Sequence, residues 1–219
     1  MRYLPGLVKL LGLILIGLIL PMLVMAENVT GSLTGSLTGS LTGGLGGQLE
    51  NVKSLSADVS QTMSTDTGQT VTSSGHIWIQ RPGKFRYEIN SPNPEIFVSD
   101  GRNLSEYEPD LMQVVVRPLG QALSDTPLLL LSGSVEDLKK SFVSKEISKD
   151  QFVLTPMATD GLISEIGLVF KESSLVSMSI KNSFGQITTI NFSNLIENKL
   201  IPESEFKLDL PKGVDVLGG

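Results

Sequence analysis

Residues 75–119, which read GHIWIQRPGKFRYEINSPNPEIFVSDGRNLSEYEPDLMQVVVRPL, decide the fold of this chain. Apolar and polar residues alternate along this stretch. Ile77 and Ile79 share one strand face, and the other face carries His76, Trp78 and Gln80. Turn sequences interrupt the alternation at short, regular intervals, as at 81–84 (RPGK) and 100–101 (DG). The pattern predicts an antiparallel meander that buries one face and wets the other.

The same alternation flanks a helical insertion. Residues 57–63 and several runs after 151 alternate as strands, whereas 123–131 (LSDTPLLLL) and 134–142 carry helix-start signals. About ten strands with two or three short helices predict an α+β fold. Because a flat sheet of that many strands is uncommon, we expect a strongly curved antiparallel sheet with the helices over its concave face.

The first 26 residues have the composition of an export signal. Arg2 and Lys9 flank the start of an apolar run, and Ala26 is a small residue suited to cleavage. This arrangement predicts a signal peptide over 1–26 that is cleaved near Ala26. The apolar run is shorter than the roughly 20 residues of a spanning helix, and an uncleaved anchor is the alternative.

A low-complexity segment follows. The tetrad GSLT is repeated within 31–42. Its glycine, serine and threonine content predicts a flexible linker over 27–41. Leucines recur at every fourth position from Leu33 to Leu49, which favours a short helix from about Thr42 onward. We expect residues 42–219 to form a single domain.

Composition argues against catalytic, metal and nucleic-acid functions. The chain has no cysteine, which excludes thiolate metal sites, cysteine nucleophiles and a lipid on an amino-terminal cysteine. The only histidine, His76, is predicted to be structural or solvent-facing, and Glu106 and Glu108 fit a solvated sheet face better than a catalytic pair. The net charge of −6 disfavours nucleic acid as a partner. We therefore expect a non-enzymatic protein with no cofactor and no metal.

Arg81 is the polar residue with the most distinctive position. Because it precedes Pro82, its backbone is expected to be extended and to lie at a turn near the rim of the sheet. Its guanidinium stays charged and carries five donors in a fixed fork. Two interpretations remain open: a surface residue on a turn, or a latch that binds backbone carbonyls at a helix end.

Several motifs, each weak alone, occur in an order and spacing that resemble the LolA family of outer-membrane lipoprotein carriers. The similarity runs from about Leu49 to Leu217. The motifs are LSADVSQT at 55–62, GHIWIQRPGKFRYE at 75–88, VSDG at 98–101, YEPDL at 107–111, DTPL at 125–128, FVLTP at 152–156, NSFGQIT at 182–188 and FKLDLPKGVDV at 206–216.

The resemblance implies an incomplete β-barrel with a helical lid over an apolar cavity. It implies a periplasmic chaperone that takes acylated lipoproteins from an inner-membrane lipoprotein-releasing ABC transporter to an outer-membrane receptor, acting as a monomer. Arg81 corresponds to the latch of the lid, and Phe85 to the rim that meets the release complex. The receptor shares the fold but is itself a lipoprotein, which the absence of cysteine excludes here. The alternative function is a periplasmic lipid-sensing regulatory domain of the same fold.

A carrier of this kind needs apolar walls that hide acyl chains from water. We predict that Leu128, Leu129, Leu130 and Leu131 plug the empty cavity as part of the lid. The alternative is that these residues and the wall residues form a solid core. The predicted inward positions on one half of the sheet are Ile77, Ile79, Phe85, Tyr87, Ile96 and Val98.

Overall fold

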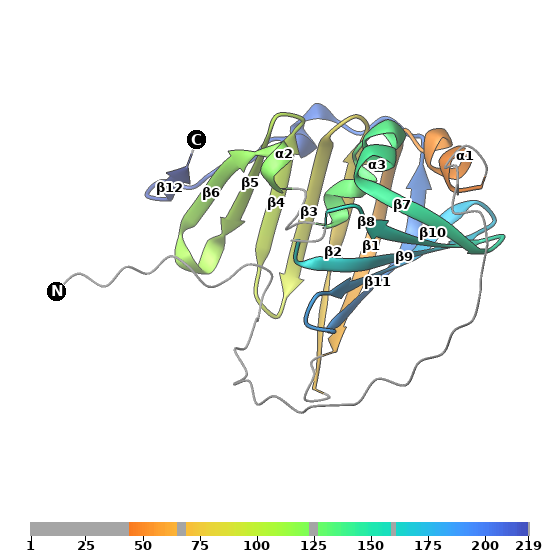
Figure 1. The fold of residues 1–219 in the computed structure, drawn as a ribbon. Helices are drawn as coiled ribbons and strands as arrows, with labels where there is room; N and C mark the ends of the chain where they lie inside the picture. The colour runs from red at the N-terminus through yellow and green to blue at the C-terminus, as the bar shows by residue number, and fades with distance from the viewer. Residues whose placement is uncertain (1–43, 65–68, 123–126, 159–160, 219) are drawn as a thin grey trace, which may run out of the picture. The chain divides into compact units, whose positions relative to one another are not determined.

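The computed structural model describes residues 44–64, 69–122, 127–158 and 161–218 (Figure 1). Within these ranges the chain forms one 12-stranded sheet with the order β12-β6-β5-β4-β3-β2-β1-β11-β10-β9-β8-β7. Neighbouring strands are antiparallel except β12, which pairs in parallel with β6. None of the helices in these ranges has the length and apolar character needed to cross a bilayer.

The meander predicted from 75–119 is formed by β2 to β6. The strands are β1 (Ser54–Ser64), β2 (Thr70–Gln80), β3 (Lys84–Ser91), β4 (Glu95–Asp100), β5 (Asn103–Glu108), β6 (Gln113–Pro118), β7 (Phe142–Ser148), β8 (Gln151–Pro156), β9 (Ile163–Lys171), β10 (Ser174–Asn182), β11 (Ile187–Glu197) and β12 (Asp215–Gly218). The helices are α1 (Gly44–Asn51), α2 (Leu119–Ala122), α3 (Val135–Ser141) and the 3₁₀ helices η1 (Pro109–Leu111), η2 (Pro127–Leu131) and η3 (Glu203–Phe206).

The predicted helices lie close to their expected positions. The leucine spacing continues into α1, where Leu45 and Leu49 are both 3% exposed. At the start of α3, Ser134 accepts a hydrogen bond from the Asp137 amide at 3.1 Å, which caps the helix. The insertion predicted over 123–131 contains the 3₁₀ helix η2. The signal peptide (1–26) and the linker (27–41) lie outside the described residues and stay predictions.

The sheet has two distinct faces. In the β2–β3 register, Ile77 pairs with Tyr87 and Ile79 with Phe85, whereas Trp78 pairs with Arg86. Paired residues point to the same side of a sheet, so the first four side chains share one face. We call this the inner face, and the face of Trp78 and Arg86 the outer face.

The helices cover the inner face. Leu45 and Leu49 of α1, Leu131 of η2 and Leu138 of α3 belong to the same apolar core as the inner-face strand residues. Each of these four leucines is buried. Burial of a leucine side chain contributes about 1.5–3 kcal/mol, so this contact holds the short helices that propensity alone would not stabilise.

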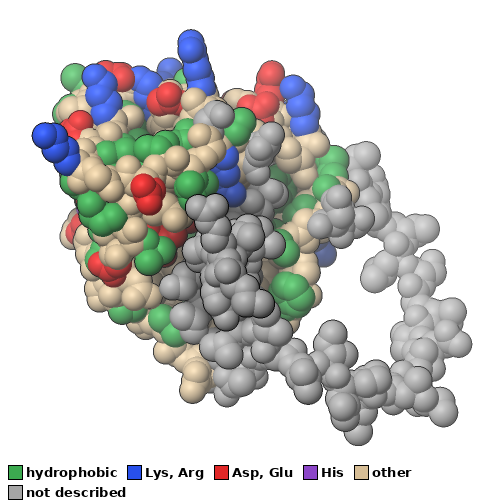
Figure 2. All heavy atoms as spheres, turned by 90° about the vertical axis from the view of Figure 1, so that its left-hand side faces the viewer, with side chains coloured by type: hydrophobic (Ala, Val, Ile, Leu, Met, Phe, Trp, Pro, Cys, Tyr) green, Lys and Arg blue, Asp and Glu red, His purple; other side chains and the backbone are tan. Residues whose placement is uncertain are grey.

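The outer face of β3 and β4 is covered by residues 199–214, which we call the C-terminal arm. Its helix η3 contacts both strands, and Phe206 is 4% exposed. Lys84 Nζ donates to Glu203 Oε1 at 2.6 Å and ties the arm to β3. After the C-terminal arm, β12 lies at the edge of the sheet beside β6. Figure 2 views the molecule from the β12 side, where exposed hydrophobic side chains lie among charged ones.

Candidate functional site

Arg81 joins two of the helical elements that cover the inner face. It lies in the turn between β2 and β3, where its Nε donates to the Leu131 carbonyl at 2.8 Å and its Nη1 donates to the Leu49 carbonyl at 2.5 Å. Leu131 ends η2 and Leu49 lies in the last turn of α1. Burial lowers the pKa of the Arg81 guanidinium from its ordinary value, yet arginine remains charged at neutral pH.

The rest of this turn reinforces the same contact. The Gly83 amide donates to the Ser132 carbonyl at 2.8 Å, directly after η2. Ser99 Oγ in turn donates to the Gly83 carbonyl at 2.8 Å. Gly83 has φ of +79°, a conformation that a residue with a Cβ rarely adopts. The β2–β3 turn therefore binds η2 through both a side chain and the main chain. The latch role of Arg81 was predicted from the resemblance, and it stays a prediction.

The inner-face positions predicted on β2 and β3 lie together beneath these helices. Ile77, Ile79 and Tyr87 are at most 3% exposed and belong to the shared apolar core. Tyr87 Oη donates to Gln61 Oε1 at 3.4 Å. Burial, with a smaller contribution from the charge of Glu95, raises the pKa of Tyr87 above its ordinary value. The phenol of Tyr87 is therefore neutral at physiological pH.

The predicted lid leucines reach the same core. Leu128, Leu130 and Leu131 are buried and contact it. The side chain of Leu129 lies outside the described part of the chain. In this structure the inner face is thus covered by helical leucines. Their role as a plug for a cavity stays a prediction.

Ile96 and Val98 require a correction. The β3–β4 register pairs Ile96 with Glu88 and Val98 with Arg86, which places both on the outer face. Phe97, which pairs with Tyr87, occupies the inner face in their place and stacks on that ring with centroids 6.3 Å apart. The C-terminal arm covers the outer face of β4, and residues 96–98 (IFV) are accordingly apolar at every position. The sequence therefore has no apolar–polar alternation here from which the inner face could be predicted.

Phe85 is fully buried on the inner face, with 0% exposure. The resemblance implied a rim residue that meets a partner complex. In the conformation described here its ring is covered, and contact with a partner requires that the covering helices move. The partner role of Phe85 stays a prediction.

An ion pair also lies on the inner face. Leu104 pairs with both Ser99 and Arg117, and Glu106 pairs with Phe97, so Glu106 and Arg117 point to the same side as Phe97. Arg117 Nη2 lies 3.2 Å from Glu106 Oε2, and the two side chains are 19% and 11% exposed. Glu106, which sequence alone suggested was on a solvated face, is therefore part of the wall near α2.

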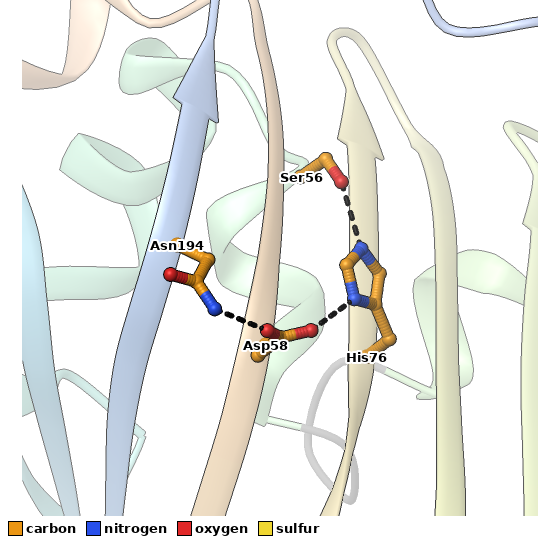
Figure 3. A network of polar contacts seen from close by, with 4 residues as sticks. All are labelled: Ser56, Asp58, His76 and Asn194. Carbon is orange, nitrogen blue, oxygen red and sulfur yellow. Dashed lines mark hydrogen bonds and ion pairs between the residues drawn. The ribbon is translucent and has the colours of Figure 1, made fainter.

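The outer face holds a polar network that the sequence did not predict (Figure 3). His76 Nε2 lies 2.8 Å from Ser56 Oγ, His76 Nδ1 lies 2.7 Å from Asp58 Oδ1, and Asn194 Nδ2 donates to Asp58 Oδ2 at 2.7 Å. The hydrogen bond from Asn194, followed by that from His76, lowers the pKa of Asp58 below its ordinary value. The β1–β2 register, which pairs Asp58 with His76, was not available from residue spacing.

The order serine, histidine, aspartate resembles a hydrolase triad, but the surroundings do not suit that chemistry. Ser56 lies inside β1 between β2 and β11, where backbone amides lie in the plane of the sheet. Backbone donors aimed at an oxyanion above Ser56 are therefore lacking in this strand. The network instead joins β2, β1 and β11. Across the described ranges, no group of three or more potential ligand side chains is placed to hold a metal ion.

Comparison with known proteins identifies the family. The family model described as outer membrane lipoprotein carrier protein LolA matches residues 50–209. The chain belongs to the LolA family. The match spans all of β1 to β11, including Arg81 and the whole covered inner face. The resemblance predicted from the sequence motifs is thereby confirmed.

Curated relatives support the same assignment. The LolA-family chain is 39% identical over 173 residues to an outer-membrane lipoprotein carrier protein of Chromohalobacter salexigens, covering 77% of this chain and 82% of the relative. It is 34% identical over 200 residues to one of Pseudomonas putida, covering 90% and 97%. These are carriers and not enzymes, in agreement with the prediction of a non-enzymatic protein.

A solved structure shares the fold. An uncharacterized conserved protein from Thermus thermophilus superposes with a TM-score of 0.50 at 10% identity, covering 78% of this chain and 96% of that chain. At this identity the likeness concerns the fold alone.

Proposed function

We propose that this LolA-family carrier is a periplasmic chaperone that shelters the acyl chains of lipoproteins against the inner face of its sheet. It takes them from an inner-membrane release complex of the ABC transporter class to an outer-membrane receptor. The carrier function is that of the family; the route, the compartment and the action as a monomer are the proposal. The predicted export signal and the absence of cysteine fit a protein that is released after export.

The energetics of acyl chains explain why such a protein needs a covered face. Burial of each CH₂ group is worth about 0.8 kcal/mol. Exposing the three acyl chains of a triacylated lipoprotein to water therefore costs a free energy on the order of tens of kcal/mol. A soluble carrier must replace that water with an apolar wall. Ile77, Ile79, Tyr87 and Phe97 supply such a wall on β2, β3 and β4.

We propose that the sheet curls into an incomplete barrel around this wall. In Figure 1, β7 to β9 run at a steep angle to β2 to β6. Leu104 of β5 and Phe152 of β8 are far apart in the strand order, yet both belong to one apolar core. A curled sheet brings such strands to a common interior.

The observation that carries the proposal is the position of Arg81. Its guanidinium binds carbonyls of both α1 and η2, on the side of the sheet where Ile77, Ile79 and Tyr87 form an apolar wall. We propose that the leucines of these elements occupy the space that acyl chains take when cargo is bound. Breaking the contacts of Arg81 lets the helices move aside, and remaking them favours release of the cargo. Helix movement would also uncover Phe85 for the release complex.

The test is transfer of a lipoprotein from carrier to receptor in a reconstituted assay. We expect Arg81→Leu to accept cargo but to retain it, because a lid that closes poorly no longer competes with the acyl chains. Arg86→Leu is the matched control, since Arg86 also donates to backbone carbonyls, those of Glu205 and Lys207, but on the outer face. Normal transfer by Arg81→Leu would contradict the latch role.

Mass spectrometry of lipids that co-purify with the exported protein separates the proposal from the sensor alternative. A carrier yields acylated polypeptides. Glycolipids without acylated polypeptide would favour a lipid-sensing domain of the same fold.

A further inference from the structure

A charged pair interrupts the apolar wall of the inner face. Arg117 Nη2 lies 3.2 Å from Glu106 Oε2. Their strand partners on that face, Leu104 for Arg117 and Phe97 for Glu106, both belong to the apolar core. Neither charged side chain is fully enclosed, since 19% of Arg117 and 11% of Glu106 is exposed. A molecule that lies on the wall can therefore touch the pair.

Stability alone does not account for an ion pair in this place. Removing two charges from water costs about as much as their attraction returns, and apolar residues of similar size often serve a fold equally well. Ligand sites that are mostly apolar, however, contain a few polar groups that fix the orientation of the ligand. The pair of Arg117 and Glu106 has the surroundings of such a group.

The pair lies toward the end of the wall nearest the β2–β3 turn. Arg117 precedes α2 by two positions, and the Leu119 amide at the start of α2 donates to the Arg102 carbonyl at 2.8 Å. A Cβ built on Gly83 lies 3.6 Å from Leu119 Cδ2, so α2 lies beside the turn that carries Arg81. The wall continues from there along β3 and β4, away from this turn.

We propose that Arg117, with Glu106 as its counter-charge, donates hydrogen bonds to the ester carbonyls of bound acyl chains. The inference rests on the proposed function, because it concerns the same face and the same cargo. An ester carbonyl that leaves water needs a donor, whereas the methylene groups beyond it need only apolar contact. A guanidinium carries five donors in a fork and can serve a carboxylate and a carbonyl at the same time.

Glu106 decides which ligand atoms suit the pair. An arginine without a counter-charge favours an anionic group such as phosphate. The Glu106 carboxylate brings the net charge of the pair to zero, and an uncharged acceptor such as an ester carbonyl fits better. With its ester carbonyls at Arg117, a ligand lays its methylene chains along Phe97 and Tyr87, which are paired across β4 and β3.

The inference is tested by calorimetric titration of the exported protein with two uncharged synthetic lipids. One is the N-acetyl amide of dioctanoylglyceryl-cysteine, which carries two ester carbonyls. The other is its dioctyl diether analogue, which has the same chains and no carbonyl on them. The ratio of the two affinities is compared between the parent chain and variants, because the different hydration of the two lipids then cancels.

Variants assign the recognition to the ion pair. In Glu106→Leu with Arg117→Leu, affinity for the diester should fall about tenfold, and affinity for the diether should not fall. Retained binding of the diether shows that the wall is intact. Arg86→Leu with Glu88→Leu removes an ion pair of the same type from the outer face and should change neither affinity. An unchanged ratio in the inner-face variant would overturn the proposal.

An anionic lipid tests the role of Glu106. The parent chain should bind dioctanoyl phosphatidylglycerol no more tightly than the uncharged diester. Glu106→Gln removes the counter-charge and should shift this preference several-fold toward the anionic lipid. A parent chain that already prefers the anionic lipid would overturn the assignment to an uncharged acceptor.

The proposed function and this inference fail in different ways. If the parent chain binds neither the diester nor the diether, the inner face does not shelter acyl chains, and the inference falls with that function. If the parent chain binds both lipids and the inner-face variant leaves the ratio of affinities unchanged, only the ester assignment is overturned.

Discussion

Arg81 and Arg86 lie five positions apart and bind backbone carbonyls on opposite sides of one sheet. Arg81 holds α1 and η2 against the apolar inner face, whereas Arg86 holds the C-terminal arm against the outer face and also pairs with Glu88. On the inner face, the covering elements (the inner cover) are α1, η2 and α3, which are attached by leucines and a few hydrogen bonds. On the outer face, the covering element (the outer cover) is the C-terminal arm, which is anchored by an ion pair at Lys84 and continues into β12. Arginine-to-carbonyl hydrogen bonds thus hold covering segments on both faces, and the proposed function requires only the helices on the inner face to move.

The largest effect is expected from removal of an inner-face aromatic ring. Phe85→Ala should lower the free energy of unfolding by about 4 kcal/mol, because it empties a fully buried site. Trp78→Ala, on the adjacent outer-face position of β2, should cost about half as much, since Trp78 is only half-buried. Urea denaturation of both variants checks the difference. Equal decreases in the free energy of unfolding would contradict the expectation that the inner-face ring contributes more to stability than the outer-face ring.

Loss of the latch should loosen the inner cover without unfolding the sheet. Arg81→Leu removes two hydrogen bonds from a charged donor, and we expect the opening free energy of α1 and η2 to fall by about 2 kcal/mol. That corresponds to about 30-fold faster amide exchange in 45–51 and 128–132. Hydrogen exchange measured by mass spectrometry reports this change.

Arg86→Leu tests whether the two arginines act on separate faces. This variant should speed amide hydrogen exchange in the C-terminal arm and leave the exchange rates of α1 and η2 unchanged. If Arg81→Leu instead loosened both covers equally, the two arginines would not act on separate faces.

The inner-face ion pair should contribute modestly. Glu106→Leu alone should cost about 1.5 kcal/mol, because it leaves the charge of Arg117 in a poorly solvated place. The double variant Glu106→Leu with Arg117→Leu should recover part of that loss, since apolar residues suit the wall. A double-mutant cycle in urea measures the coupling. Additive effects would show that the pair is not energetically linked.

The smallest effect concerns the outer-face network and depends on pH. The folded pKa of Asp58 is lowered, so its ionised form stabilises the fold above its unfolded pKa of about 3.9, and this contribution is lost as pH falls through the folded value. Asp58→Asn should therefore lower Tm at pH 7, by less than the other variants do. The difference from the parent chain should shrink below about pH 4. A difference that is constant from pH 7 to pH 3 would contradict a role for the charge.

Sequence patterns predicted the meander, the helical insertion and the family, because strict alternation and the turns at 81–84 and 100–101 leave few registers open. The inner positions of β2 and β3 followed from the same alternation. The prediction that Ile96 and Val98 point inward was wrong. Strand β4 is covered on both faces, so its sequence is apolar at successive positions and does not show which side chains point inward. The network of Ser56, Asp58, His76 and Asn194 arises from pairing between β1, β2 and β11, which spacing along the chain does not specify.

Photocrosslinking tests the central claim that acyl chains lie on the inner face. Phe97 on β4 and Trp78 on β2 are each replaced by p-benzoylphenylalanine, and the exported protein is loaded with a radiolabelled acylated lipoprotein. The account predicts crosslinks to the acyl chains from position 97 and none from position 78. Crosslinks of equal yield from both positions, or from position 78 alone, would contradict it.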